Sequence, residues 1–227
     1  MNGTLPLFPL GTVLFPGLVL PLHIFEERWR TLVRNLMELP DGTPREFGVV
    51  AIDRGEEVLP TPRDGLASSE VVVHEIGCVA QLRQVTEHPD GKFDIVTVGQ
   101  RRFRITGFVT SPHPYPVVGV EFLPEPPPGE QADALAPRVL AAFREYLDVL
   151  RGGPADQLPD DPTVLSHLVA ATSALTVADR QALLSAPDPA ARLRAELRLL
   201  TRETALLRNV RAVPAQLSQL GPAPQLN

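Results

Sequence analysis

The sequence predicts an α+β protein with a β-rich first half and a helical second half. From Thr4 to Leu123, short apolar segments alternate with prolines, glycines and turn residues, which is typical of strands. Pro124-Glu125-Pro126-Pro127-Pro128-Gly129 predicts a semi-rigid connector, and beyond it apolar residues recur at helical spacing. We therefore expect a β-rich domain over 1–124, a connector over 125–129, a helical bundle over 130–211 and a loose tail over 212–227.

The first half combines strands with one helix. We expect extended segments near residues 4–8, 17–22, 47–52, 71–85, 93–108 and 117–123. His88-Pro89-Asp90-Gly91-Lys92 predicts a hairpin turn, and the polar segment 53–69 predicts a surface loop. The single helix is indicated by apolar residues at helical offsets and ends near Pro40: Phe25, Trp29, Leu32, Val33 and Leu36.

Four helices are expected after the connector. The first helix is indicated by apolar residues between Leu135 and Leu150, and the second begins at Asp161-Pro162-Thr163. The third begins at Thr176, which with Asp179 resembles a capping box, and the last begins at Asp188-Pro189. The last helix has one apolar stripe: Leu193, Leu197, Leu200, Thr204 and Leu207. This stripe packs inside the bundle or against a second copy, which leaves homo-oligomerisation open.

Composition and charge argue against a nucleic-acid partner, a disulfide, a multi-cysteine zinc site and a membrane helix. The net charge is -6 and neither half is basic, so we expect no nucleic-acid partner. The single cysteine, Cys78, excludes an intrachain disulfide and a multi-cysteine zinc site. No apolar run approaches the roughly 20 residues of a membrane helix, and no basic segment precedes the first apolar residues. We expect a cytoplasmic protein that does not bind membranes.

Motifs for catalysis are absent from the sequence. It contains neither Gly-x-x-x-x-Gly-Lys-Ser/Thr nor Gly-x-Ser-x-Gly, and its only lysine, Lys92, lies on the expected hairpin turn, where it keeps its proton. The histidines are scattered: His23, His74, His88, His113 and His167. His74 and Cys78, four residues apart on an expected strand, have the spacing of side chains on one face, but two ligands do not make a metal site. We predict no catalytic residue, cofactor or metal.

One basic cluster, Arg101-Arg102-Phe103-Arg104, could bind a phosphate or stack on a nucleic-acid base. Because the chain is acidic, we favour ion pairs with acids across the expected hairpin: Glu87, Asp90 or Asp94.

Several ordered segments resemble the amino-terminal, substrate-binding domain of Lon proteases. They begin with Leu5-Pro6-Leu7-Phe8-Pro9-Leu10, Leu14-Phe15-Pro16-Gly17 and Leu20-Pro21-Leu22-His23-Ile24-Phe25-Glu26. Gly77-Cys78-Val79-Ala80-Gln81-Leu82 and Val98-Gly99-Gln100-Arg101-Arg102-Phe103-Arg104-Ile105 resemble its later strands. Asp179-Arg180-Gln181-Ala182-Leu183-Leu184 and Arg192-Leu193-Arg194-Ala195-Glu196-Leu197 resemble its helices. The resemblance spans about residues 4–210.

The resemblance implies a PUA-like β pseudo-barrel followed by a helical bundle, in a stand-alone protein without the ATPase and protease domains. It implies non-catalytic binding of unfolded polypeptide or of a specific protein partner. We expect the rim of a peptide groove at Leu10, Val13, Leu14, Phe15, Pro16 and Leu18. Burial in the core is the competing interpretation of these residues. The alternative functions are an enzyme or small-ligand binder with an unrecognised pocket, and weak RNA binding through the barrel.

Overall fold

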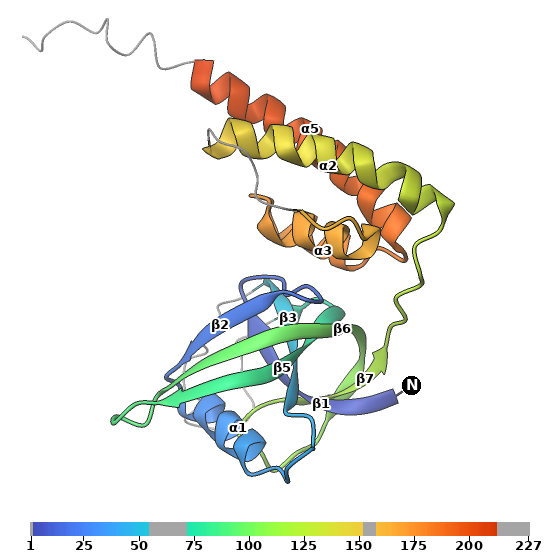
Figure 1. The fold of residues 1–227 in the computed structure, drawn as a ribbon. Coiled ribbons are helices and arrows are strands. Elements are labelled where there is room, and N and C mark those ends of the chain that lie inside the picture. Colours follow the sequence, from blue (N-terminus) through green and yellow to red (C-terminus); the bar gives the residue numbers. More distant parts are fainter. Residues whose placement is uncertain (1, 55–71, 152–157, 213–227) are drawn as a thin grey trace, which may run out of the picture.

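The computed structural model describes residues 2–54, 72–151 and 158–212, and it confirms the α+β class. A β-rich part and a helical part lie one above the other, joined by the extended segment 123–129 (Figure 1). The strands are β1 (Asn2–Leu10), β2 (Val19–Ile24), β3 (Glu46–Arg54), β4 (Val72–Val73), β5 (Ile76–Glu87), β6 (Phe93–Val109) and β7 (Val117–Phe122). The helices are α1 (Glu27–Met37), α2 (Glu130–Arg151), α3 (Pro162–Thr172), α4 (Val177–Leu184) and α5 (Pro189–Ala212).

The strands close into a ring. Hydrogen-bonded neighbours follow the order β1-β7-β6-β5-β3, and β3 pairs in parallel with β1 through the register Leu7 to Gly48. Closure of this kind removes the free edges of the five strands and encloses a core. β2 lies outside the ring and pairs with the first half of β6, while β4 pairs with β3. This arrangement is the pseudo-barrel that the resemblance implies.

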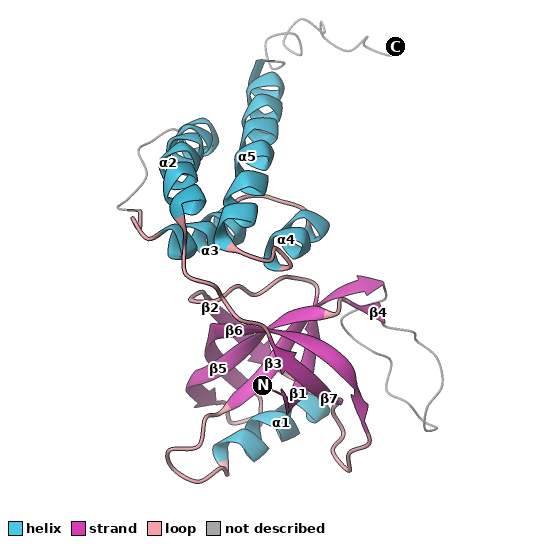
Figure 2. Cartoon of the chain, turned by 90° about the vertical axis from the view of Figure 1, so that its right-hand side faces the viewer, coloured by secondary structure: helices cyan, strands magenta, loops and turns pink. Residues whose placement is uncertain are grey.

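Helix α1 covers the end of the barrel that faces away from the helical part (Figures 1 and 2). Its buried face carries the residues expected from the helical spacing: Trp29, Leu32, Val33 and Leu36. The Trp29 ring stacks on Phe8 of β1 with ring centroids 4.2 Å apart. The predicted helix is therefore confirmed, except that Phe25 precedes it and is half exposed, and the apolar side of this short amphipathic helix completes the barrel core.

The helical part is organised around α2 and α5, which lie side by side (Figures 1 and 2). The predicted caps are present: the Thr176 hydroxyl accepts a hydrogen bond from the Asp179 amide (3.1 Å), and the Asp188 carboxylate accepts one from the Ala191 amide (2.7 Å). The stripe of α5 from Leu193 to Leu207 packs against α2 within this chain. No described helix is long and apolar enough to cross a membrane.

Parts of two sequence predictions lie outside the described residues: most of the loop 53–69 and the tail from 213 onward. The predicted strand 71–85 is observed as β4 and β5, separated by two residues, and the predicted 93–108 strand is the 17-residue β6.

The barrel and the helical part share a small apolar core. Val13 and Phe15, from the loop between β1 and β2, cluster with Leu183 and Leu184 of α4. The loop approaches β6 so closely that a Cβ atom on Gly99 would lie 2.1 Å from the Phe15 carbonyl oxygen, so only glycine fits there. Nearby, the Gln181 amide of α4 donates a hydrogen bond to the Ile76 carbonyl of β5 (2.9 Å).

A buried ion network crosses the same junction. The Glu125 carboxylate in the connector lies 3.0 Å from Arg102 of β6 and 3.1 Å from Arg192 of α5. Burial alone would raise the pKa of Glu125, but contact with His167 and the charges of Arg192 and Arg102 lower it to about 2. Arg102 also donates to the carbonyl of Leu184 (2.9 Å). One carboxylate thus links the barrel, the connector and two helices.

Candidate functional site

The six residues predicted for the rim of a peptide groove lie mostly in the interior. Leu10 and Leu14 belong to the barrel core, and Val13 and Phe15 belong to the cluster shared with the helices. Pro16 and Leu18 are partly exposed. The four buried side chains therefore match the competing interpretation of core burial, and their role in peptide binding stays a prediction.

A pocket of about 240 Å³ lies beside this segment, where β1, β2 and the start of α1 meet. Its lining is mainly apolar and aromatic: Phe8, Leu10, Leu22, His23, Ile24, Phe25, Glu26 and Trp29. Of the six predicted residues only Leu10 contributes to it. Phe25 lines the pocket with 51% of its surface exposed, so its ring is open to contact by a ligand.

β2 supplies one wall of the pocket and carries a free edge. Among the described residues β2 is hydrogen-bonded to β6 alone, so its other side is unpaired. Val19, Pro21 and His23 are exposed, whereas Leu20, Leu22 and Ile24 face the core. An unpaired strand edge beside an apolar pocket is an arrangement that binds extended peptides by strand addition. Pro21 has no backbone N–H group, so it removes a hydrogen-bond donor from β2 and limits pairing of this edge with the edge of another molecule.

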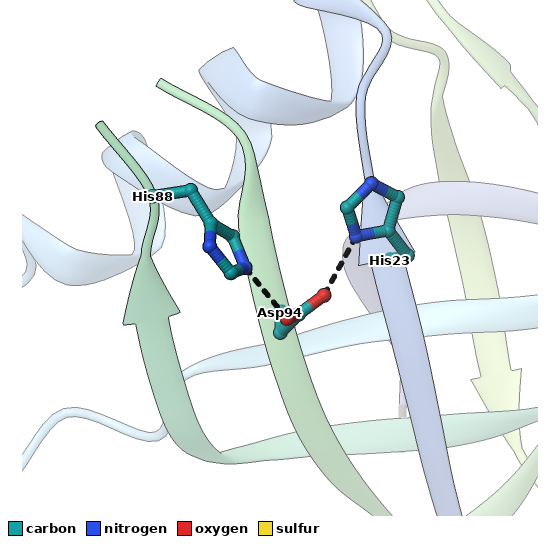
Figure 3. Close-up of side chains that lie close together, drawn as sticks. All are labelled: His23, His88 and Asp94. Atoms are coloured by element: carbon teal, nitrogen blue, oxygen red, sulfur yellow. Dashed lines mark hydrogen bonds and ion pairs between the residues drawn. The ribbon is translucent and has the colours of Figure 1, made fainter. Parts of the chain in front are cut away.

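Next to the pocket, three polar side chains converge on the outer face of the sheet (Figure 3). Both carboxylate oxygens of Asp94 lie 2.6 Å from a ring nitrogen, one from His23 Nδ1 and the other from His88 Nε2. The hydrogen bonds of His23 and His88 lower the pKa of the Asp94 carboxyl, so it is ionised at neutral pH. His23 lines the pocket as well, which joins the two features into one surface.

This cluster was not predicted from the sequence, although part of it was visible there. The expected hairpin brings His88, the first residue of its turn, close to Asp94 near the start of the following strand. His23 joins them only because β2 pairs with β6, with His23 and Asp94 as register partners. That pairing connects residues 71 positions apart, and no local pattern in the sequence specifies it.

The basic cluster on β6 is divided between two environments. Arg101 pairs with Glu46 (3.0 Å) and stacks over Phe122, while Arg102 is buried against Glu125. Ion pairing is confirmed for Arg101 and Arg102, but the predicted partners were wrong because the strand register places Arg102 opposite Cys78, whereas Glu87 lies opposite Phe93 at the hairpin end. Lys92 pairs with Asp90 at 2.7 Å.

Cys78 is fully buried, and burial raises the pKa of its thiol to about 12, which suits a structural residue. His74 lies between β4 and β5, 3.8 Å from Asp53, so the expectation that it shares a strand with Cys78 was wrong.

Comparison with known proteins identifies the domain. The family model of the ATP-dependent protease La (Lon) substrate-binding domain matches residues 4–202. The chain belongs to this family. Among solved structures, the Lon N-terminal domain protein from Xanthomonas campestris shares the fold, with a TM-score of 0.60 and 24% identity over 88% of this chain and 98% of that one. The N-terminal domain of the Mycobacterium avium complex Lon protease gives a TM-score of 0.59 at 21% identity, with 89% and 98% covered.

Curated relatives of this Lon-type domain are much longer. The Lon protease of Koribacter versatilis is 31% identical over 202 residues, which cover 84% of this chain and 23% of that protein. The Lon protease of Flavobacterium johnsoniae is 27% identical over 194 residues, which cover 80% of this chain and 22% of that protein. The chain thus spans less than a quarter of the length of these two proteases.

Proposed function

We propose that this Lon-type domain binds unfolded polypeptide segments without catalysing a reaction on them. The observation that carries the proposal is the apolar pocket beside the free edge of β2, with the exposed ring of Phe25 at its wall. An unfolded segment differs from a folded protein in presenting apolar side chains together with free backbone groups. The pocket would accept the side chains, and the strand edge would accept the backbone.

The pocket supports binding better than catalysis. Its lining contains two ionisable side chains, His23 and Glu26, and the Glu26 carboxylate is already paired with Arg28 at 2.8 Å. The remaining lining residues are apolar or aromatic and offer neither a nucleophile nor a general acid. The family description, a substrate-binding domain, supports the same function.

The proposal is tested by fluorescence anisotropy with a labelled, reduced and alkylated model protein that cannot refold. We expect saturable binding to the full chain and no binding of the same protein in its folded form. Phe25→Ser should weaken binding by about tenfold or more, equivalent to about 1.4 kcal/mol, because an aromatic anchor is lost from the pocket. Folding should be unaffected, since half of the Phe25 surface is already exposed.

The matched control is Phe108→Ser. Phe108 is 71% exposed and lies at the other end of β6, beyond the segment that pairs with β2. Its removal lowers surface hydrophobicity by at least as much as Phe25→Ser does but leaves the pocket intact, so affinity should stay at the wild-type value. Equal losses in the two variants would show nonspecific adhesion and reject the pocket as the binding site.

A further inference from the structure

The cluster of His23, His88 and Asp94 has the composition of a divalent metal site. Its three potential ligand atoms, two imidazole nitrogens and one carboxylate oxygen, all lie within 4.8 Å of one another. Two histidines with one carboxylate form a common donor set for Zn²⁺ and related transition ions, with further positions left for water. Purely acidic clusters favour Mg²⁺ or Ca²⁺ instead, so the two imidazoles indicate the class of ion.

The geometry requires only small side-chain movements. In a tetrahedral site with ligand distances of about 2.0–2.1 Å, neighbouring ligand atoms are roughly 3.3 Å apart. His23 Nδ1 and His88 Nε2 lie 2.6 Å from different oxygens of Asp94, so with both oxygens turned to the ion each of these pairs has to open by less than about 1 Å. The two nitrogens lie within 4.8 Å of each other and have to close by up to about 1.5 Å. Figure 3 shows both rings directed at Asp94, which lies between them. An ion placed among the three side chains would replace the two hydrogen bonds with coordinate bonds.

The three ligands are held by a rigid scaffold but remain accessible. His23 and Asp94 are cross-strand partners of β2 and β6, and His88 follows the end of β5 in the turn closed by the hydrogen bond from its amide to the Lys92 carbonyl (2.9 Å). Gly91 adopts φ 75° there, which lets the turn remain tight. The side chains of His23, Asp94 and His88 are 56%, 53% and 39% exposed, so an ion can enter from solvent.

We propose that His23, His88 and Asp94 bind one Zn²⁺-class transition-metal ion per chain, at the edge of the apolar pocket. The ion would tie β2 to the β5–β6 hairpin, and its open coordination positions would face solvent next to Phe25, whose ring lies 6.3 Å from that of His23. Ligation through His23 Nδ1 and His88 Nε2 places the remaining proton of each neutral ring on its other nitrogen. The site does not depend on the proposed peptide binding.

Isothermal titration of the metal-free full chain with ZnCl2 tests the site. We expect saturable binding of one Zn²⁺ per chain, and at least about tenfold weaker binding in each of His23→Asn, His88→Asn and Asp94→Asn. Co²⁺ provides a second measurement, because a four- or five-coordinate site gives visible d–d bands that are much stronger, and at longer wavelength, than the weak band of octahedral hydrated Co²⁺. These bands should be present in the wild-type chain and lost in the three variants.

His113→Asn is the matched control, because His113 is an exposed histidine that stacks on Tyr115 away from the cluster. The Zn²⁺ affinity and the Co²⁺ spectrum of the His113→Asn variant should equal those of the wild type. Circular dichroism checks that all variants are folded. Absence of saturable Zn²⁺ binding by the wild-type chain, or binding that survives all three substitutions, would overturn the proposal and leave the cluster as a hydrogen-bonded clamp. Peptide anisotropy measured without metal remains a separate test of the pocket.

Discussion

Glu196 of α5 is an ionisable residue in the interior of the helical part. Its side chain is fully buried, and neither carboxylate oxygen accepts a hydrogen bond from the described residues. Burial raises the pKa of Glu196 well above its usual value, and the charge of Arg192, one helical turn earlier, offsets this only in part. The folded chain therefore holds this carboxyl in its neutral form at a pH where the unfolded chain has released the proton.

The raised pKa of Glu196 makes the free energy of unfolding depend on pH. Since the folded state binds the proton more tightly, the free energy of unfolding falls as pH rises above the ordinary carboxyl pKa of 4.5. Glu196→Gln removes the titration and keeps the shape, so the variant should become more stable than the wild type as pH rises from 5 to 8. Urea unfolding across that range measures the difference.

A substitution of the same kind at the surface, Glu145→Gln on α2, should leave the pH profile of the wild type unchanged, because Glu145 is half exposed and paired with Arg208. If the free energy of unfolding of the wild type changed with pH in the same way as that of Glu196→Gln, Glu196 would be ionised in the folded chain.

At the scale of elements, the loop between β1 and β2 is a docking element for the helices. Phe15 has no exposed surface, and its ring lies 6.2 Å from that of His167 on α3. Backbone hydrogen bonds between Gly17 and Gly99 (2.8 Å) and between Gly99 and Leu18 (2.9 Å) fix the loop on β6. Its apolar residues thus contribute to the junction between the two parts of the chain rather than to an open surface.

Phe15→Ala should therefore reduce the free energy of unfolding by about 3–5 kcal/mol, the usual cost of truncating a buried phenylalanine. Urea denaturation measures this loss, and Phe15→Leu should show a smaller one because more of the volume is kept. A peptide-binding role for Phe15 predicts the opposite pattern, with weakened binding of unfolded polypeptide and unchanged stability. Measuring both the free energy of unfolding and the affinity for unfolded polypeptide on Phe15→Ala separates the core role of Phe15 from a peptide-binding role.

The elements were predictable because their signals are local. Alternation along β6, the spacing of apolar residues in α1 and the caps at Thr176 and Asp188 act within a few residues of the positions they specify. The candidate site was less predictable because it is made by strand pairing. The sequence shows Leu14 and Phe25 as equally apolar, and only the closed barrel decides that Leu14 is buried and Phe25 is half exposed.

At the scale of the whole molecule, one carboxylate joins the two parts. Arg102 and Arg192 are almost fully buried, and both depend on Glu125 in the connector for charge compensation. Two buried cations without a partner would be costly, whereas the same cations around one carboxylate are compatible with a stable fold. The sequence predicted the connector from its prolines, but it gave no sign that Glu125 among them is the central acid.

Glu125→Ala should lower the free energy of unfolding by about 3 kcal/mol, because it leaves two buried arginines uncompensated. It should also weaken the coupling between barrel and helices. Trp29, the only tryptophan, reports unfolding of the barrel by fluorescence, and circular dichroism reports mainly the helices. In the wild type the two urea transitions should coincide, and in Glu125→Ala their midpoints should separate. Glu145→Ala, which breaks an exposed ion pair, should change neither measurement appreciably.

The pH dependence of the same variant follows from the lowered pKa of Glu125. A carboxyl whose folded pKa is about 2 stabilises the chain above its unfolded value of 4.5, and this stabilisation is lost as pH falls from 4.5 towards 2. The difference in unfolding free energy between wild type and Glu125→Ala should therefore shrink across that interval and be largest at neutral pH. A difference that stays constant between pH 7 and pH 2.5 would show that packing of the connector, and not the charge of Glu125, holds the barrel against the helices.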